Sequence, residues 1–235
     1  LFLADGGLSP WKNAELHYTL RQDINGRYAR SGLQKAYLKQ QAGKFSLTFG
    51  KDSEHIGPGR QALLLSQNAA PFLMLRVKTE RPLDWHGKWD IVALNGWLFE
   101  ERRDRDNPRI FIGRLGWAPV PLFALGLTRA SEYGGEGRPD LNPWEIPYML
   151  WGAEENSSTG KYNTDGYLSY DLSVNMPQAL RPAAAKSFKV YYERACTDLA
   201  ASWQKEDSGH YYFPFGIKMQ LNAYLAGAVI ETERH

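Results

Sequence analysis

Carboxylates and aromatic rings gather between residues 132 and 165 of the 235-residue sequence. Glu132, Glu136 and Asp140 lie close enough in sequence to supply a glycosidase pair, which needs two carboxylates held at a fixed separation. The sequence alone does not set that separation, and carboxylates are common in surface loops. Catalysis is therefore the weaker of two interpretations of this stretch.

The second interpretation is saccharide binding. Aromatic faces pack against the apolar side of sugar rings, and planar polar groups bond to their hydroxyls. The stretch combines both kinds of residue: Tyr133, Trp144, Tyr148 and Trp151 beside Glu136, Arg138, Asp140, Glu154, Glu155 and Asn156. The structural alternative is that these rings pack the stretch onto the rest of the fold.

Signatures of metal, nucleotide and covalent chemistry are missing from the sequence: it has no HExxH, CxxC, GxSxG, P-loop or dinucleotide fingerprint. Asp52, Glu54 and His55 are neighbours in an extended segment, where successive side chains point apart. The single Cys196 excludes an internal disulfide and is best interpreted as a small apolar filler. We therefore expect no cofactor and no metal.

Extended strands must position these residues, because apolar and polar side chains alternate along much of the chain. The longest example runs from Phe215 to Leu225, with Phe215, Ile217, Met219, Leu221, Ala223 and Leu225 on one parity. It exceeds the usual soluble strand of about five or six residues and fits the roughly nine to eleven that cross a membrane. The apolar parity is expected to meet lipid, and the polar parity to face enclosed water.

About ten strands are predicted and no helix of two turns or more. The other strands are 14–21, 35–41, 44–50, 72–79, 88–100, 109–117, 122–132, 167–175 and 187–193. The connections between them are 22–32, 42–43, 51–70, 80–87, 101–108, 118–121, 133–165, 177–185 and 199–211, mostly long and short in turn. Short periplasmic turns alternating with longer outer loops are typical of outer-membrane barrels.

The polar parity of these strands carries charges: Glu15, His17, Arg21, Arg76, Lys78, Asp171, Lys189, Glu193 and Lys218. Each Lys or Arg facing lipid near the middle of the bilayer would cost roughly 2–4 kcal/mol. This side of the sheet is therefore expected to be wet. A soluble β-sandwich with one solvated face would give the same local alternation, and a lipocalin-like barrel would reverse it.

Composition restricts the function classes. Hydrophobic residues make up 43% of the chain, yet no apolar run approaches the 18 or so residues of a transmembrane helix. A net charge of +2 without a basic cluster gives no sign of a nucleic-acid partner. The 8 Trp and 13 Tyr suit interfacial girdles or sugar-stacking surfaces, as well as a soluble aromatic core. Because the sequence begins at Leu1 without Met or a signal peptide, we expect a processed or partial chain.

Three stretches resemble one family, the outer-membrane capsule assembly proteins of the Wzi type. The first is GPGRQALLLSQNAAP at 57–71, which is similar to a Gly-Pro-Gly segment followed by Leu-Ser-x-Asn-Ala-x-Pro. The second is IFIGRL at 110–115, and the third is GLTRA at 126–130 with GGEGRP at 134–139. The resemblance covers roughly 41–155 and departs at Ile56, where the family often has Trp before Gly-Pro-Gly.

The resemblance implies a large antiparallel barrel of about 18 strands in the outer membrane of a Gram-negative bacterium. Residues 1–235 would be part of that single barrel domain, with 133–165 as a long loop. It also implies a lectin-like, non-enzymatic role in holding capsular polysaccharide or exopolysaccharide at the cell surface. Outer-membrane lipid is then a second partner, and other envelope proteins are candidate partners.

The motif residues also suggest a binding site. The glycines Gly57, Gly59, Gly126 and Gly135 are expected to allow tight backbone paths. A polar network in the lumen or at its mouth, suited to anionic polysaccharide because Arg forks pair with carboxylates, would use Arg60, Asn68, Arg114, Arg129, Glu136 and Arg138, with Trp144 and Trp151 as stacking rings. The remaining alternatives are a diffusion porin and a soluble carbohydrate-binding module or hydrolase.

Overall fold

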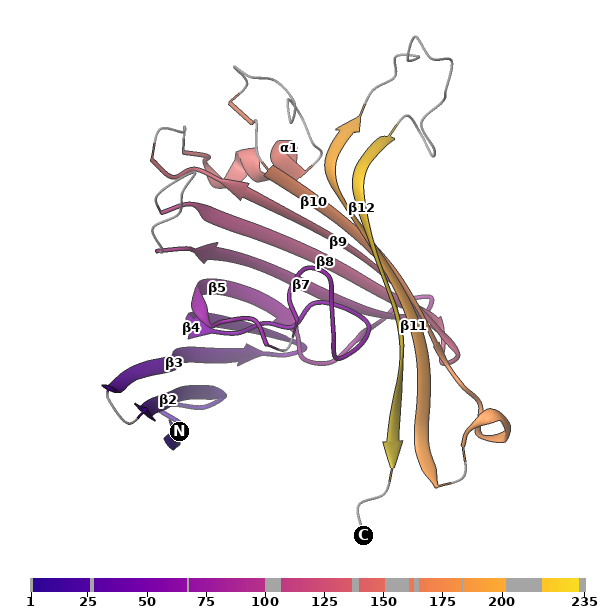
Figure 1. The fold of residues 1–235 in the computed structure, drawn as a ribbon, viewed down its shortest axis with the longest axis horizontal. Helices are drawn as coiled ribbons and strands as arrows, with labels where there is room; N and C mark the ends of the chain where they lie inside the picture. The colour runs from indigo at the N-terminus through magenta and orange to yellow at the C-terminus, as the bar shows by residue number, and fades with distance from the viewer. Residues whose placement is uncertain are drawn as a thin grey trace.

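The computed structural model describes residues 2–25, 28–66, 68–99, 107–136, 140–150, 161–162, 165–182, 184–201 and 217–232. Within them the chain forms one sheet of 12 strands (Figure 1). The strands are β1 (Phe2–Leu8), β2 (Ala14–Asn25), β3 (Tyr28–Ala42), β4 (Phe45–Asp52), β5 (Phe72–Thr79), β6 (Leu83–Asp84), β7 (Lys88–Trp97), β8 (Arg109–Val120), β9 (Phe123–Tyr133), β10 (Asp165–Asn175), β11 (Ala185–Ala201) and β12 (Ile217–Thr232). Three short helical segments lie in the connections: η1 (Pro143–Glu145), α1 (Ile146–Leu150) and η2 (Gln178–Leu180).

The sheet is an antiparallel meander. Its order is β1-β2-β3-β4-β5-β7-β8-β9-β10-β11-β12, with the two-residue β6 pairing only with β7. Apart from this exception, each strand bonds to the strands before and after it in sequence, and β1 and β12 have one neighbour each among the described residues. The predicted antiparallel all-β class is confirmed.

Ten of the strands occupy the predicted positions, and the prediction misses two. β1 contains Asp5, Gly6 and Gly7, which break the alternation, and β6 is too short to show one. The predicted connection 22–32 is wrong, because the β2–β3 ladder continues as far as Asn25↔Tyr28. Consecutive polar residues end the local pattern there, but cross-strand backbone pairing does not need alternation.

The two faces of the sheet differ in polarity in the opposite sense to a soluble protein. We call inner the face that carries Ser46, Thr48, Arg76, Thr128, Asp171 and Glu193, all at most 8% exposed. The outer face carries exposed apolar side chains: Leu47, Phe49, Leu75, Val77, Leu115, Leu125 and Leu127, at 40–54% exposed. Strand β4 alternates between them residue by residue. Arg76, Asp171 and Glu193, which were predicted to lie on the water-facing side of the sheet, thus lie together on the inner face.

The predicted orientation of the Phe215–Leu225 stretch is wrong where side chains are described. Leu225 pairs with Glu193 and so shares the inner face, whereas Tyr224 pairs with Arg194 on the outer face. The β11–β12 ladder has register irregularities between Ala195 and Leu199. Because a one-residue irregularity exchanges the faces, alternation across it does not mark one face. The side chains of 215–221 lie outside the described residues.

The connections at the two ends of the sheet differ in length. One end has the connections 53–71, 98–108, 134–164 and 202–216, together with the short 26–27. The other end has 9–13, 43–44, 80–87, 121–122 and 176–184. Apart from 26–27, this is the predicted alternation of long and short links. We call the first the outer end and the second the periplasmic end, following the barrel pattern.

Residues 53–71, which we call the in-folded segment, leave β4 at the outer end and fold back onto the inner face. Figure 1 shows this segment as the violet coil that lies between β5 and β11 in that view. An isolated bridge between Ile56 and Leu65 closes it on itself. Ile56, 2% exposed, packs with Leu94, Ile112 and Ala130 from β7, β8 and β9. A small apolar core therefore fixes the segment to an otherwise polar face.

The exposed apolar outer face predicts a position-dependent cost of charge. Replacing Leu75 in the middle of β5 by Arg should destabilise the protein folded in a bilayer by about 2–4 kcal/mol. Leu122→Arg, in the two-residue β8–β9 turn, should cost less than about 1 kcal/mol. Reversible denaturant unfolding in lipid vesicles measures both. Equal costs at the two positions would contradict contact between this face and acyl chains.

Candidate functional site

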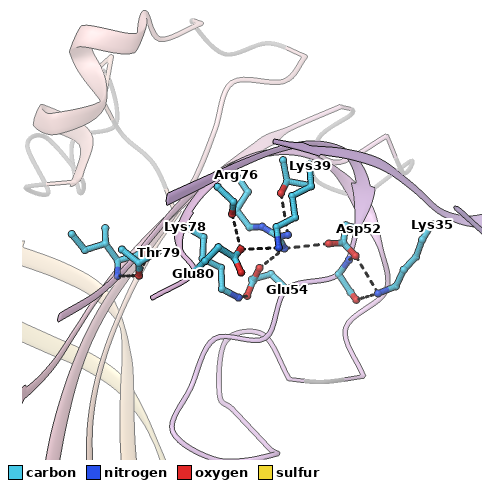
Figure 2. A network of polar contacts seen from close by, with 12 residues as sticks. Lys35, Lys39, Asp52, Glu54, Arg76, Lys78, Thr79 and Glu80 are labelled. Carbon is cyan, nitrogen blue, oxygen red and sulfur yellow. Dashed lines mark hydrogen bonds and ion pairs between the residues drawn. The ribbon is translucent and has the colours of Figure 1, made fainter. Parts of the chain in front are cut away.

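A network of charges fixes the start of the in-folded segment to β4 and β5 (Figure 2). The guanidinium of Arg76, itself 8% exposed, bonds to Glu54 and lies 3.2 Å from an Asp52 oxygen. Lys78 reaches Glu54 at 3.1 Å, and Lys35 reaches Asp52 at 3.1 Å. Three cations thus neutralise two carboxylates. This arrangement makes Asp52 and Glu54 structural, because removing one partner of a buried pair leaves an uncompensated charge.

The far side of the in-folded segment is fixed to β11. The carboxylate of Glu193, 1% exposed, accepts hydrogen bonds from the Leu63 backbone N–H at 3.1 Å and from Ser169 Oγ at 2.9 Å. The Lys189 ammonium donates to the Pro58 carbonyl oxygen. Gly59 lies under the Tyr191 ring, where an added Cβ would come within 2.1 Å of the ring carbon Cζ. The Gly-Pro-Gly motif therefore allows close approach to β11.

A second buried ion pair lies on the inner face between β8 and β10. Arg114 binds Asp171 with both terminal nitrogens, at 2.6 and 3.1 Å, and also donates to Thr128 at 3.0 Å. The two side chains meet above Gly126 on β9, whose added Cβ would lie 2.2 Å from an Asp171 oxygen. Gly126, the first glycine of the third motif, is thus needed because the Arg114 and Asp171 side chains pass directly over its backbone.

A helical platform at the outer end is anchored to the outer face of β7–β9. Met149 of α1 is fully buried and packs with Tyr133 and Leu141, which are 4% and 8% exposed. The Tyr133 hydroxyl donates to Asn95 Oδ1 at 2.6 Å. At the start of η1, Asn142 and Glu145 form a capping box, with the Asn142 N–H donating to Glu145 at 2.8 Å. These contacts fix the direction in which the opposite side of the platform points.

The platform also carries exposed rings, and we define the outer aromatic surface as Trp144 and Tyr148 with Glu145, Lys161 and the half-buried Tyr162, which packs against the Met149 cluster. Trp144 is 71% and Tyr148 62% exposed. Tyr148 and Tyr162 stack with ring centres 6.1 Å apart, and the Lys161 ammonium lies 6.0 Å from the Tyr162 ring centre. Hydrogen bonds from Lys161 and from the Asn142 N–H hold the pKa of the Glu145 carboxyl below its ordinary value. Rings beside fixed charges are suited to a charged sugar chain.

The structure disperses the predicted site residues. Trp144 lies in the outer aromatic surface, and Arg60 and Asn68 are exposed on the in-folded segment. Arg114 is held by Asp171 inside the sheet, and Arg129 lies on the outer face of β9, only 8% exposed. Glu136 is exposed beyond β9, whereas Arg138 and Trp151 lie outside the described residues. The two arginines therefore do not join the exposed residues in one network.

Three residues of the outer aromatic surface are missing from the prediction of the site. Glu145 follows Asn142 at capping-box spacing, a signal that the sequence does contain. Lys161 and Tyr162 are brought to it only by tertiary contact, through Glu145. No local pattern marks such a contact.

No helix in the described part of the chain is long and apolar enough to cross a membrane. No group of three or more His, Cys, Asp or Glu side chains there is placed to hold a metal ion.

Comparison with known proteins gives a family match over most of the chain. The family model described as capsule assembly protein Wzi matches residues 12–225. An uncharacterised 55.8 kDa protein in the cps region of Klebsiella pneumoniae is 29% identical over 104 residues, which are 40% of this chain and 20% of that protein. The chain thus spans a small part of this relative's length.

A solved structure shares the fold. It is Wzi of Escherichia coli, described as an outer-membrane protein involved in group 1 capsule assembly and as a carbohydrate-binding β-barrel. It aligns with a TM-score of 0.56 at 14% identity, covering 89% of this chain and 53% of that one. The chain spans about half the length of this structural relative.

The crossing of Arg114 and Asp171 over Gly126 predicts an asymmetric response to adding a methyl group. Gly126→Ala should break the buried pair and destabilise the folded state by about 3–5 kcal/mol. Gly113→Ala on the adjacent strand should be nearly neutral, because its added Cβ meets nothing closer than 3.5 Å. Unfolding of both variants in detergent gives the comparison. Similar stabilities would show that the crossing is not needed.

Proposed function

The chain belongs to the family of the capsule assembly protein Wzi, and from this premise we propose that it binds capsular or related surface polysaccharide without catalysis. It is an outer-membrane protein, and its antiparallel sheet shares its fold with a β-barrel of that class. Binding at the outer end of the sheet helps to attach or assemble the polysaccharide at the cell surface. We treat residues 1–235 as part of one barrel domain, with outer-membrane lipid and other envelope proteins as further partners.

The outer aromatic surface is the observation that carries this proposal. Trp144 and Tyr148 remain mostly exposed, although large rings gain free energy by burial. They stand on a platform whose other side is fixed by the buried Met149, so they are presented in a set direction. Preorganised rings lose little conformational entropy on binding. A sugar ring stacked on them would have Glu145 and Lys161 beside it to bond its hydroxyls and charges.

Binding of anionic polysaccharide draws on the predicted residues that are exposed. Arg60, Asn68 and Glu136 have no ion pair within the described structure and keep side chains accessible to a ligand. Arg114 takes part indirectly: its guanidinium already binds Asp171, and this pair links β8 to β10 instead of contacting the ligand. Arg138 and Trp151 stay predicted ligand residues of the same outer loop.

A role without catalysis is supported by the partners of the acidic residues. A glycosidase needs one carboxyl to donate a proton and a second carboxylate opposite to it. Asp140 lies 3.6 Å from Arg109, and Glu145 is bonded to Lys161 and stays ionised. Asp52 and Glu54 are neutralised by Arg76 and lysines. None of these four is arranged to donate a proton to a substrate.

A diffusion porin is the second candidate function, because the inner face is polar. The in-folded segment argues against it. It is held at β4–β5 through Glu54 and Arg76 and at β11 through Leu63 and Glu193, so it runs across the inner face from one part of the curved sheet to another. A segment fixed at both walls narrows any channel along the inner face. We therefore favour binding over permeation.

Truncating the outer rings is the test of the proposed site. The double variant Trp144→Ala/Tyr148→Ala should weaken binding of purified capsular polysaccharide by roughly 2- to 12-fold per ring, because a ring contact contributes about 0.5–1.5 kcal/mol. Trp85→Ala is a matched control, since Trp85 is 69% exposed but lies at the periplasmic end. Surface plasmon resonance on the detergent-purified protein measures affinity. Unchanged affinity in the double variant removes this surface from the function.

Planar-bilayer recordings separate the two candidate functions. The purified protein should show no steady open channel, because the in-folded segment obstructs the inner space. Lys189→Ala/Glu193→Ala removes the contacts to Pro58 and Leu63 and should produce frequent openings. Lys186→Ala, exposed at the start of β11, should behave like the unmodified protein. A large, steady conductance in the unmodified protein would instead identify a porin.

A further inference from the structure

Arg194 projects from the outer face of β11, the face that otherwise carries exposed apolar side chains. Its guanidinium lies between two tyrosine rings, 5.9 Å from the centre of Tyr170 and 5.4 Å from that of Tyr224. Nη1 donates to the Tyr170 hydroxyl at 3.1 Å. Nε and Nη2 donate to Asn222 Oδ1 at 3.0 and 2.8 Å. The guanidinium is therefore held flat against the sheet wall.

This cation has no acidic partner within the described structure, unlike the arginines of the inner face. Arg76 binds Glu54 and Asp52, and Arg114 binds Asp171. Arg194 has five N–H donors and uses three of them on Tyr170 and Asn222, which are neutral. One N–H on each terminal nitrogen remains, and guanidinium N–H groups donate well to the oxygens of a phosphate or carboxylate.

The polarity of the outer face changes at the level of Arg194. Toward the periplasmic end, β11 and β12 present Phe188, Val190, Ala226, Ala228 and Ile230 on this face. Tyr192 follows at the level of Ala226, Tyr224 lies level with Arg194, and Asn222 lies beside Arg194 toward the outer end. A change from aliphatic residues to Tyr, Arg and Asn is typical of the membrane–water interface. Nine residues separate Ala185 from Arg194, which is roughly 23 Å of height for a strand tilted by about 40°.

We propose that Arg194, Tyr170, Tyr224 and Asn222 form a binding site for the phosphorylated sugar head of an outer-leaflet glycolipid. The site faces lipid, lies at the outer boundary of the apolar band and offers an unneutralised guanidinium to an anion. Phosphate oxygens accept from Arg194, and the Tyr224 hydroxyl and Asn222 amide are neighbouring donors for sugar or phosphate oxygens. Such a contact would compensate a charge that is unfavourable where it faces acyl chains.

This site is independent of the polysaccharide proposal. The outer aromatic surface stands on η1 and α1, beyond β9, whereas the Arg194 site belongs to the wall formed by β10, β11 and β12. The lipid would fill the bilayer side of the sheet, and the polysaccharide would contact the outer end. Variants of one site should leave binding at the other unchanged.

Native mass spectrometry of the detergent-purified protein with lipid A, bearing both phosphates or enzymatically dephosphorylated, tests the proposal. The unmodified protein should retain the phosphorylated form roughly tenfold better, and Arg194→Gln should lose this preference. Arg194→Lys keeps the charge without the guanidinium and should retain part of it. Lys186→Gln, at the other end of the same strand, is the matched control and should retain all of it.

Two outcomes would overturn the proposal. One is equal retention of the two lipids by the unmodified protein, which decides the matter even if Arg194→Gln does not fold. The other is an unchanged preference in a folded Arg194→Gln protein, with folding checked by heat-dependent gel mobility. If Lys186→Gln also lost the preference for phosphorylated lipid A, the site would be rejected as well. The preference would then reflect a general attraction between the protein's positive charges and phosphate.

Discussion

The attachment of residues 53–71 to two walls of the sheet is the constraint on which the remaining structure depends. At one wall the Arg76 guanidinium holds Glu54, and at the other the Glu193 carboxylate accepts the Leu63 N–H. Both groups are almost fully buried, so each needs its partner to compensate the loss of hydration. The inner face can be polar because Arg76 is paired with carboxylates and Glu193 accepts hydrogen bonds from Leu63 and Ser169. The inner face is also packed, because Ile56 of the in-folded segment contacts Leu94, Ile112 and Ala130 on it.

This attachment assigns packing and ligand binding to different parts of the sheet: the inner face packs against residues 53–71, and the outer end binds ligand. The charged side chains named on the inner face already have ion-pair or hydrogen-bond partners within the protein, and a sugar chain would have to displace those contacts in order to bind there. The exposed rings of the outer aromatic surface have no such competition, since their anchoring residues lie beneath them. Binding at the outer end and closure by the inner face are thus consistent with each other. The outer face has a third environment, in which Arg194 is the exception to an apolar surface.

Alternation in the sequence predicts most of the strands, because period-two patterning follows directly from strand geometry. It fails where tertiary pairing decides. The ladder from Arg21 to Asn25 has no clean alternation, and the irregularity near Ala195 reverses the faces that Leu225 and Tyr224 were expected to occupy. For the site, residue type identifies Trp144 as an exposed ring. It does not distinguish Arg114, which binds a carboxylate two strands away, from arginines that remain available to ligand.

Low sequence identity with a shared fold follows from the same physics. At 14% identity the chain still aligns over 89% of its length with a barrel of known structure. An apolar outer position accepts Leu, Val, Ile or Phe with little difference, because lipid imposes no shape on it. Positions where side chains cross a backbone are different. A Cβ added at Gly126 would lie 2.2 Å from an Asp171 oxygen, and one added at Gly59 would lie 2.1 Å from a Tyr191 ring carbon. No other residue fits at either position unless these neighbours move.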